Sequence, residues 1–346
     1  MKTLHVINSI DKTLGGQVYA ALDIVRMENL LGLETTILTS KSDNIDPLFY
    51  EYAKIKQFTY SWPRRFYNSK KAVYFYEENN KYDLVIFHGV WSMLIYRIAK
   101  ICSENNIPMV LWPHGSVDPF DLKKKKTLKK VIGLVFIKRL FNKLNYLICT
   151  SVLEKEKIEK FGATVKTKIA PLPVSYSNQK GIREKFRDKY NFDKNDFVLL
   201  FLSRVDYKKG LNLLLPAIKN ILQEKKNIKL IIAGTGDKKY EMKVNQWIDE
   251  YNLNGTVRCI GFISGQDKSD AFSGSDCFVL PSMNENFGIA IVEALNAGLP
   301  VMISTNVYIW NEIITKNGGW ICDYSVGSVS KTIKNIIDDK KDYIIK

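Results

Sequence analysis

The amino-acid sequence predicts an α/β protein built from two doubly wound halves, and three observations support this. Short apolar runs typical of buried strands alternate with amphipathic stretches typical of helices, which is the pattern of parallel sheets. The runs form two series, separated by the polar, proline-containing stretch 170–178. At 346 residues with 46% hydrophobic content, the chain can build two domains with cores of their own.

Each series contains five predicted strands. Those of the first series are residues 4–8, 34–39, 84–88, 109–112 and 146–150, and those of the second are residues 197–202, 229–233, 257–259, 277–280 and 301–304. Open α/β sheets bind ligands outside the carboxyl ends of their strands. We therefore expect an active cleft where these ends of the two halves face each other.

Composition and charge exclude several classes of protein. The content of apolar and aromatic residues is that of a globular protein, and the five cysteines have neither metal-ligand spacing nor the pattern of a small disulfide framework, which fits a reducing compartment. The N-terminus lacks an apolar signal region, and no run of about 18 apolar residues could span a bilayer. The formal net charge is +15 and lies mostly in the first half. We expect a cytoplasmic protein whose membrane contact, if any, is peripheral.

Two carboxylates, Glu285 and Glu293, lie on either side of a turn and the start of a helix. The turn contains Phe287 and Gly288, and the helix is predicted over 289–296. The start of such a helix presents unpaired backbone N–H groups, which suit a diphosphate, and the carboxylates can bind vicinal hydroxyls. The spacing thus fits a sugar nucleotide, although glutamates in such places are often solvated surface groups.

Pro-Ser, Glu, Phe-Gly, Glu-Ala and Gly-Leu-Pro occur together between residues 281 and 300, and this combination resembles the donor site of the family 4 retaining glycosyltransferases. The resemblance implies that Glu285 contacts the transferred sugar, that Glu293 holds the ribose hydroxyls, and that the amides of Phe287, Gly288 and Ile289 face the phosphates and the sugar. It also implies the two-domain GT-B architecture.

In that architecture residues 1–172 form an acceptor-binding Rossmann-like domain and residues 173–328 a nucleotide-sugar-binding one. A C-terminal helix over 329–346 can pack back on the first domain, and a fraying tail is the alternative.

Basic residues follow the first strand of the second half. Arg204 and Lys209 lie at the strand exit and the next helix start, where both can neutralise a diphosphate and stabilise the charge that grows as it leaves. They match the Arg and Lys-Gly pattern of the family, although basic loop residues are often only solvated. Gly234, in a Gly-x-Gly turn, and Phe262 follow the next two strands, and the resemblance places them beside the nucleotide base.

The first half supplies glycine and histidine candidates. Gly15 and Gly16 open a helix after the first strand, where amides can meet a phosphate. His88 and His114 each end a strand, and we consider both for acceptor binding; His114 is also expected to orient the sugar and stabilise charge near the anomeric carbon. His5 is most simply a packed core residue. Three scattered histidines do not indicate a metal site.

A basic segment runs from residue 121 to residue 145. Its apolar residues recur at helical spacing, which indicates packing on the sheet, and its lysines can contact an anionic membrane. The lysines that carry this membrane hypothesis are Lys123, Lys124, Lys125, Lys126, Lys129 and Lys130.

Taken together, we expect a retaining, metal-independent hexosyltransferase that needs no further cofactor. It would use a nucleotide diphosphate sugar, preferably a UDP-sugar, and a glycan or polyprenyl-diphosphate-linked saccharide at the inner membrane surface, in the assembly of a bacterial surface polysaccharide. The alternatives are a sugar nucleotide epimerase and a basic polyanion-binding protein; the lysine segment lacks interleaved aromatic residues that would stack bases, so we expect no nucleic acid. Asn286 stands where relatives commonly have glycine, which leaves the choice of sugar open.

Overall fold

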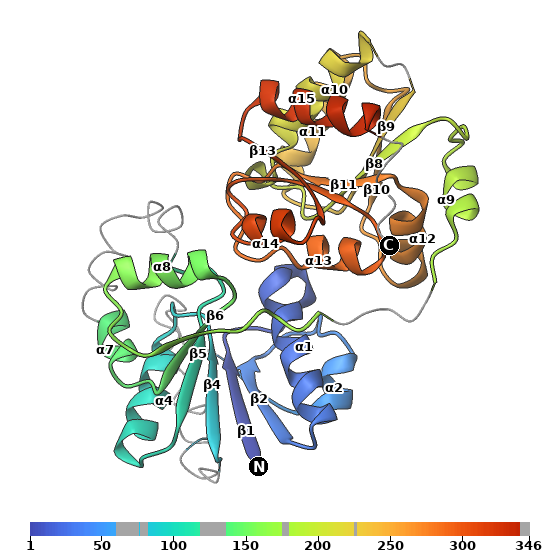
Figure 1. Ribbon diagram of the computed structural model, residues 1–346. Helices are drawn as coiled ribbons and strands as arrows, with labels where there is room; N and C mark the ends of the chain where they lie inside the picture. Colours follow the sequence, from blue (N-terminus) through green and yellow to red (C-terminus); the bar gives the residue numbers. More distant parts are fainter. Residues whose placement is uncertain (60–75, 77–81, 118–135, 175–179, 225–226, 340–346) are drawn as a thin grey trace. The chain divides into compact units, whose positions relative to one another are not determined.

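The computed structural model describes the chain except for residues 60–75, 77–81, 118–135, 175–179, 225–226 and 340–346. The chain forms two compact units, Met1–Pro173 and Val174–Lys346, and each is described by itself (Figure 1). The predicted boundary between residues 172 and 173 lies one residue before that of the units.

The first unit contains a seven-stranded parallel sheet with the order β3-β2-β1-β4-β5-β6-β7. Its strands are β1 (Lys2–Ile7), β2 (Glu34–Ser40), β3 (Lys54–Phe58), β4 (Leu84–His88), β5 (Met109–Trp112), β6 (Tyr146–Cys149) and β7 (Thr167–Ile169). Its described helices are the 3-10 helix η1 (Lys12–Leu14), α1 (Gly16–Leu30), α2 (Leu48–Tyr52), α4 (Met93–Glu104), α7 (Lys138–Phe141) and α8 (Val152–Phe161).

The two faces of this sheet bury different groups. Along β1, Leu4 and Val6 belong to a core cluster shared with α4, whereas Ile7 belongs to a cluster shared with α1 and α2. Side chains alternate between faces along a strand, so His5 lies on the α1 face. This alternation places a polar side chain of the central strand beneath α1.

The second unit contains a six-stranded parallel sheet with the order β10-β9-β8-β11-β12-β13. Its strands are β8 (Phe197–Leu202), β9 (Ile228–Ala233), β10 (Val257–Gly261), β11 (Cys277–Leu280), β12 (Val301–Ser304) and β13 (Gly319–Cys322). Its described helices are α9 (Arg183–Lys189), the 3-10 helix η4 (Tyr207–Lys209), α10 (Leu211–Leu222), α11 (Lys238–Glu250), α12 (Gly265–Gly274), α13 (Ile289–Asn296), α14 (Trp310–Thr315) and α15 (Val326–Asp338). Helices α10, α11 and α15 cover one face of the sheet, and α12, α13 and α14 cover the other, with α9 packed against α12 (Figure 1).

All ten predicted strands are present, and the prediction of two parallel α/β sheets is confirmed. The structure adds β3, β7 and β13, each of which is the last strand at an edge of its sheet. Edge strands have less surface to bury, and β3 and β7 expose most of their residues. β3 and β7 lack the continuous apolar run that reveals a central strand, whereas β13 has one, Gly-Trp-Ile-Cys, that was not predicted as a strand.

The end of the chain belongs to the second unit. We expected a helix over 329–346 that could return to the first domain; instead α15 ends at Asp338 and packs on α10 and β13. Val329, Ile333 and Ile336 are its buried residues on that face. Residues 340–346 of the expected helix lie outside the described residues.

Gly210 lets two loops of the second unit approach each other closely. It lies between η4 and α10 with a φ of 83°, in the left-handed region, and a Cβ atom there would lie 2.0 Å from the carbonyl oxygen of Pro281. Pro281 follows β11 directly. The missing side chain therefore allows the loop after β8 to pack on the loop after β11.

We predict that Gly210→Ala destabilises the second unit by at least about 1–2 kcal/mol, the cost of a left-handed backbone for alanine, and separates these two loops. Gly255→Ala is the matched control, because a Cβ atom at Gly255 would meet no atom within 4 Å. Urea denaturation followed by circular dichroism measures both effects. Equal stability of the two variants would contradict the close-approach argument.

Candidate functional site

The candidate residues lie where the strand order of each sheet reverses. In the first sheet the order reverses between β1 and β4, and in the second between β8 and β11. Such switch points leave a crevice at the carboxyl ends of the strands. The loops that leave these strands hold most of the residues predicted from the sequence.

Lys209 and Glu285 form an ion pair at the switch point of the second sheet. The Nζ atom of Lys209 donates a hydrogen bond to Oε2 of Glu285, and their side chains are only 13% and 18% exposed. The backbone of Glu285 pairs with the loop after β12, since its N–H donates to Asn306 O (3.2 Å) and its carbonyl accepts from Tyr308 N (3.0 Å). Three loops thus hold one carboxylate beside one ammonium group.

The loop after β8 has a defined shape that presents Lys209. Asp206 caps η4 by accepting a hydrogen bond from the backbone N–H of Lys208 (2.9 Å). The carbonyl of Lys208 in turn accepts from Met283 N (2.7 Å), which ties the loop to the segment before Glu285. Arg204, in the same loop, is exposed. Of the two predicted cations, Lys209 is therefore held in place and Arg204 faces solvent.

Helix α13 begins where the sequence predicted and has no side-chain cap. Gly288 precedes it with a φ of 76°, Phe287 is buried, and the first turn of the helix starts at Ile289. Without a capping side chain, the first amides of the helix are open to an anion. The positions of Phe287, Gly288 and Ile289 are thus compatible with their predicted role toward a diphosphate.

Glu293 lies within α13 and has a basic partner that the sequence did not reveal. Lys268 of α12 donates a hydrogen bond of 2.6 Å to its Oε1 atom. The role of Glu293 toward ribose hydroxyls stays a prediction, and Lys268 is the residue that fixes its carboxylate in this structure. No local spacing could reveal this pair, because the two residues lie on different helices.

Gly234 and Phe262 have different environments. Gly234 has a φ of 133°, and a Cβ atom there would lie 1.9 Å from the carbonyl oxygen of Ser203, so the glycine allows the exits of β8 and β9 to touch. Phe262 follows β10 and is 65% exposed. An exposed aromatic ring beside this edge of the sheet can stack on a nucleotide base, and that contact stays a prediction.

In the first unit the two predicted glycines differ. Gly15 caps the start of α1 with a φ of 78°, whereas Gly16 is the first residue of α1, and a Cβ atom there would meet no atom within 4 Å. The next side chain, Gln17, lies over Gly89 at the exit of β4. The uncapped start of α1 therefore lies beside the exit of β4, with open space above Gly16.

The three histidines of the chain form one hydrogen-bonded row. His5 Nδ1 lies 2.9 Å from His88 Nε2, and His88 Nδ1 lies 2.9 Å from His114 Nε2. The rings are stacked, with centroids 5.2 Å apart at each step. His5 and His88 are buried, and His114 is partly exposed.

This row corrects one assignment and extends another. The sequence suggested that His88 binds the acceptor. Its side chain is fully buried between two imidazoles, so it cannot touch an acceptor directly. His5 is a core residue as expected, but it also hydrogen-bonds Glu28 of α1, with 2.9 Å between Nε2 and Oε2. Desolvation lowers the pKa of His88 well below its ordinary value and that of His114 to about 3. His114 is the member of the row that can reach a ligand.

Glu154 holds the turn that carries His114. This carboxylate is 2% exposed, and it accepts hydrogen bonds from Gly115 N (2.7 Å) and Thr150 N (2.6 Å). His114 itself has a φ of 50°, which a tight turn requires. Glu154 was not among the residues predicted from the sequence, although a carboxylate in the first turn of α8 is a recognisable capping signal.

The lysines of the membrane hypothesis, residues 123–130, lie outside the described residues. Within the described part of the chain, no group of three or more His, Cys, Asp or Glu residues is arranged to hold a metal ion. In that same part, no helix is both long and apolar enough to cross a membrane.

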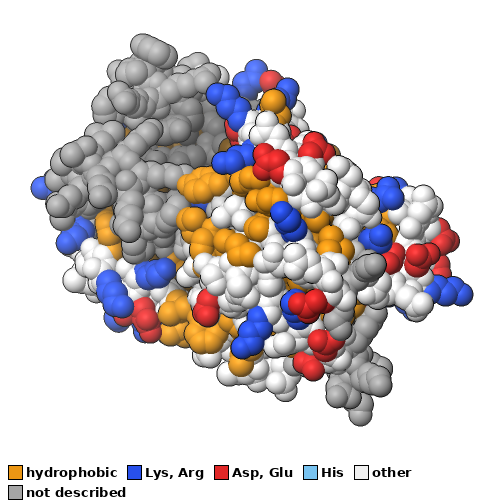
Figure 2. Space-filling view, turned by 90° about the horizontal axis from the view of Figure 1, so that it is seen from above, with side chains coloured by type: hydrophobic (Ala, Val, Ile, Leu, Met, Phe, Trp, Pro, Cys, Tyr) orange, Lys and Arg blue, Asp and Glu red, His pale blue; other side chains and the backbone are white. Residues whose placement is uncertain are grey.

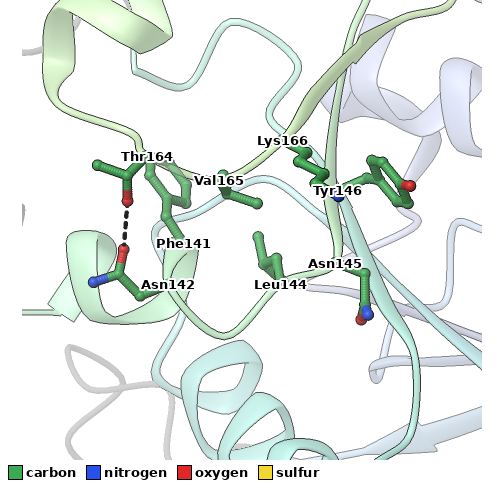
Figure 3. A pocket seen from close by; sticks show the side chains of 8 residues that line it. All are labelled: Phe141, Asn142, Leu144, Asn145, Tyr146, Thr164, Val165 and Lys166. Atoms are coloured by element: carbon green, nitrogen blue, oxygen red, sulfur yellow. Dashed lines mark hydrogen bonds between the residues drawn. The ribbon is translucent and has the colours of Figure 1, made fainter.

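A pocket lies at the amino ends of the strands of the first sheet, opposite the ends that carry the candidate residues (Figure 3). Its lining comes from the segments that precede β6 and β7, at the amino ends of these strands, and Thr164 donates a hydrogen bond of 3.0 Å to Asn142 across it. The lining residues are Phe141, Asn142, Leu144, Asn145, Tyr146, Thr164, Val165 and Lys166. Its position away from the carboxyl ends of the strands separates it from the candidate site.

The chain is similar to known glycosyltransferases in sequence and in fold. Residues 14–177 match the family described as Glycosyltransferase Family 4, and residues 182–344 match the family described as Glycosyl transferases group 1. An uncharacterized glycosyltransferase of Methanocaldococcus jannaschii is 31% identical over 164 residues, which is 46% of this chain and 41% of that protein. The alpha-monoglucosyldiacylglycerol synthase of Streptococcus pneumoniae is 22% identical over 240 residues, which is 67% of this chain and 52% of that protein.

The chain spans about half the length of the curated relatives it matches. Among solved structures, the Anabaena protein HepE in complex with UDP and glucose has a TM-score of 0.80 and 20% identity, over 99% of this chain and 91% of its own. The fold is therefore GT-B. Together, the two family matches and the fold show that the chain belongs to the group 1 glycosyltransferases of family 4.

Proposed function

We propose that the protein transfers a hexose or N-acetylhexosamine from a nucleotide diphosphate sugar, preferably a UDP-sugar, to a glycan or lipid-linked saccharide, with retention of configuration. The observation that carries the proposal is the Lys209–Glu285 pair beside the uncapped start of α13. An ammonium group and open helix amides suit a diphosphate, and a carboxylate suits sugar hydroxyls.

Two relatives support the choice of substrates. The HepE structure contains UDP and glucose, and the Streptococcus pneumoniae relative is named for the synthesis of a glucosylated diacylglycerol. They favour a UDP-sugar as donor and a lipid-linked acceptor, which would be extended at the cytoplasmic face of the membrane during the assembly of a bacterial surface polysaccharide.

The chemistry that we propose needs no metal ion. Arg204, Lys209 and the first amides of α13 stabilise the leaving diphosphate, and Glu285 and His114 hold the transferred sugar. The acceptor hydroxyl attacks from the face that the diphosphate leaves and gives its proton to the departing phosphate.

A double-mutant cycle tests the central pair. We predict that Lys209→Met and Glu285→Gln each lower the transfer rate at least about a hundredfold, equivalent to ~2.7 kcal/mol of transition-state stabilisation. Each single change also leaves one largely buried group without its partner, at a cost of about 3 kcal/mol of folding stability. The double variant should regain stability but not activity, as measured by denaturation and by release of UDP.

The matched control for this cycle is Lys334→Met with Glu224→Gln. This ion pair of the second unit is more exposed, so its loss should cost less than about 1 kcal/mol and leave transfer unchanged. If the Lys209/Glu285 double variant regained transfer together with stability, the pair would be a structural feature only.

Retention can be measured on the product. With a UDP-hexose and a short lipid-linked saccharide, we predict a new glycosidic bond with the same anomeric configuration as the donor, observed by NMR of the purified product. The rate should be the same in EDTA, because the proposed stabilisation of the diphosphate comes from side chains and amides. An inverted product, or an isomerised sugar nucleotide formed without acceptor, would refute the proposed reaction.

Membrane contact rests on the lysine-rich segment. On the face shown in Figure 2, the described Lys and Arg side chains are interspersed with Asp and Glu, so that part of the surface offers little attraction to an anionic bilayer. A run of lysines contributes about 1 kcal/mol per residue near such a surface.

We therefore predict that Lys125→Ser with Lys126→Ser weakens binding to vesicles containing phosphatidylglycerol by about 30-fold, from the loss of ~2 kcal/mol. Vesicle sedimentation at fixed ionic strength measures this change, with Lys238→Ser and Lys239→Ser of the second unit as a control of equal charge. Equal effects of the two double variants would show that only net charge matters.

A further inference from the structure

The row of histidines in the first unit ends on the carboxylate of Glu28, whose side chain is 13% exposed. Oε2 of Glu28 accepts hydrogen bonds from Thr3 Oγ1 (2.8 Å) and Thr35 Oγ1 (3.1 Å), and it lies 2.9 Å from His5 Nε2. Burial raises the pKa of Glu28, but its hydrogen bonds with His5, Thr3 and Thr35 lower it, and the net pKa lies below its ordinary value. Glu28 is therefore a carboxylate at neutral pH, and it can only accept.

An acceptor at one end sets the direction of every hydrogen bond in a row of imidazoles that carry one proton each. His5 must donate from Nε2 to Glu28, and with one proton on its ring it accepts at Nδ1 from His88. Desolvation keeps His88 neutral, so His88 donates from Nε2 and accepts at Nδ1 from His114. His114 thus donates its Nε2–H to His88 and has a free lone pair on Nδ1.

We propose that Glu28, acting through His5 and His88, holds His114 as the neutral tautomer whose Nδ1 accepts a hydrogen bond from a substrate hydroxyl. The inference rests on the proposed function, because it assigns the ligand of His114 within that reaction. A lone pair at Nδ1 repels phosphate oxygens and attracts a hydroxyl hydrogen. His114 therefore binds a sugar or acceptor hydroxyl and not a phosphate oxygen.

The surroundings of His114 fix the position of this lone pair. Trp112 stacks on the imidazole with ring centroids 6.1 Å apart, and Glu154 anchors the next backbone amide, that of Gly115. Glu28, His5 and His88 are positioning residues, since His114 is the one imidazole of the row that reaches the surface of the unit. The opposite direction of the row, with Nδ1–H pointing outward, requires one additional proton on His5.

The tautomer can be measured without any enzyme assay. In protein labelled with 15N-histidine, we expect His114 to show a protonated Nε2 and an unprotonated Nδ1, with no titration between pH 5 and 8. Couplings across the N–H···N bonds should join His114 to His88 and His88 to His5. A protonated Nδ1 on His114, or the absence of these couplings, would overturn the proposal whether or not the protein transfers sugar.

Glu28→Gln tests the role of the carboxylate, because an amide can donate to His5 as well as accept from it. We expect mixed tautomers at His114, a fall in kcat of about tenfold (~1.4 kcal/mol) and an unchanged Kd for UDP. Glu34→Gln, which removes one exposed carboxylate of the same unit, should change none of these. If folded Glu28→Gln protein showed an unchanged tautomer at His114 and an unchanged kcat, the proposal would be refuted. If the wild-type protein had the stated tautomer but transferred no sugar, only the proposed function would be refuted.

Discussion

The parallel pairing of β8 with β11 is the constraint on which the candidate site depends. These strands are far apart in sequence, but their pairing brings the loops that leave them to one point. Gly210 then lets the first loop pack on Pro281, and Lys209 meets Glu285 across the contact. Neither residue could hold the other without this crossover, because 76 positions separate them in the chain.

The two units use the same topology for different chemistry. At the switch point of the second sheet, the loops present charged groups and helix amides, which suit a diphosphate. At the switch point of the first sheet, three hydrogen-bonded imidazoles lie in a row. They come from β1, β4 and the loop after β5, and His114 is the outermost. The switch point of the second sheet is thus suited to an anion, and the histidine row of the first unit ends in an imidazole suited to a hydroxyl group.

The sequence predicted the parts of the fold that local patterns determine. Central strands are continuous apolar runs, and α13 starts after a glycine and ends before another, so both could be located. Edge strands β3 and β7 could not, since most of their residues are exposed and form no apolar run; the short apolar strand β13 was missed as well. Glu285, Lys209 and Gly288 were found because they combine chemistry with a strand exit.

The partners of the candidate residues could not be predicted in the same way. Lys268 meets Glu293 only because α12 packs beside α13, and Glu28 meets His5 only because α1 covers that face of β1. His88 was assigned to a ligand because it ends a strand, but the face on which it lies buries it between two rings. Side-chain pairing of this kind is a property of tertiary packing.

Hydrogen–deuterium exchange in the presence of saturating UDP tests the account most directly. We expect slower exchange at the first amides of α13, at Ile289 and Ala290, and in the loop 203–210 after β8, because these groups would hold the diphosphate. Protection confined to the pocket before β6 and β7, or no protection in the second unit at saturating UDP, would contradict the assignment of the nucleotide site.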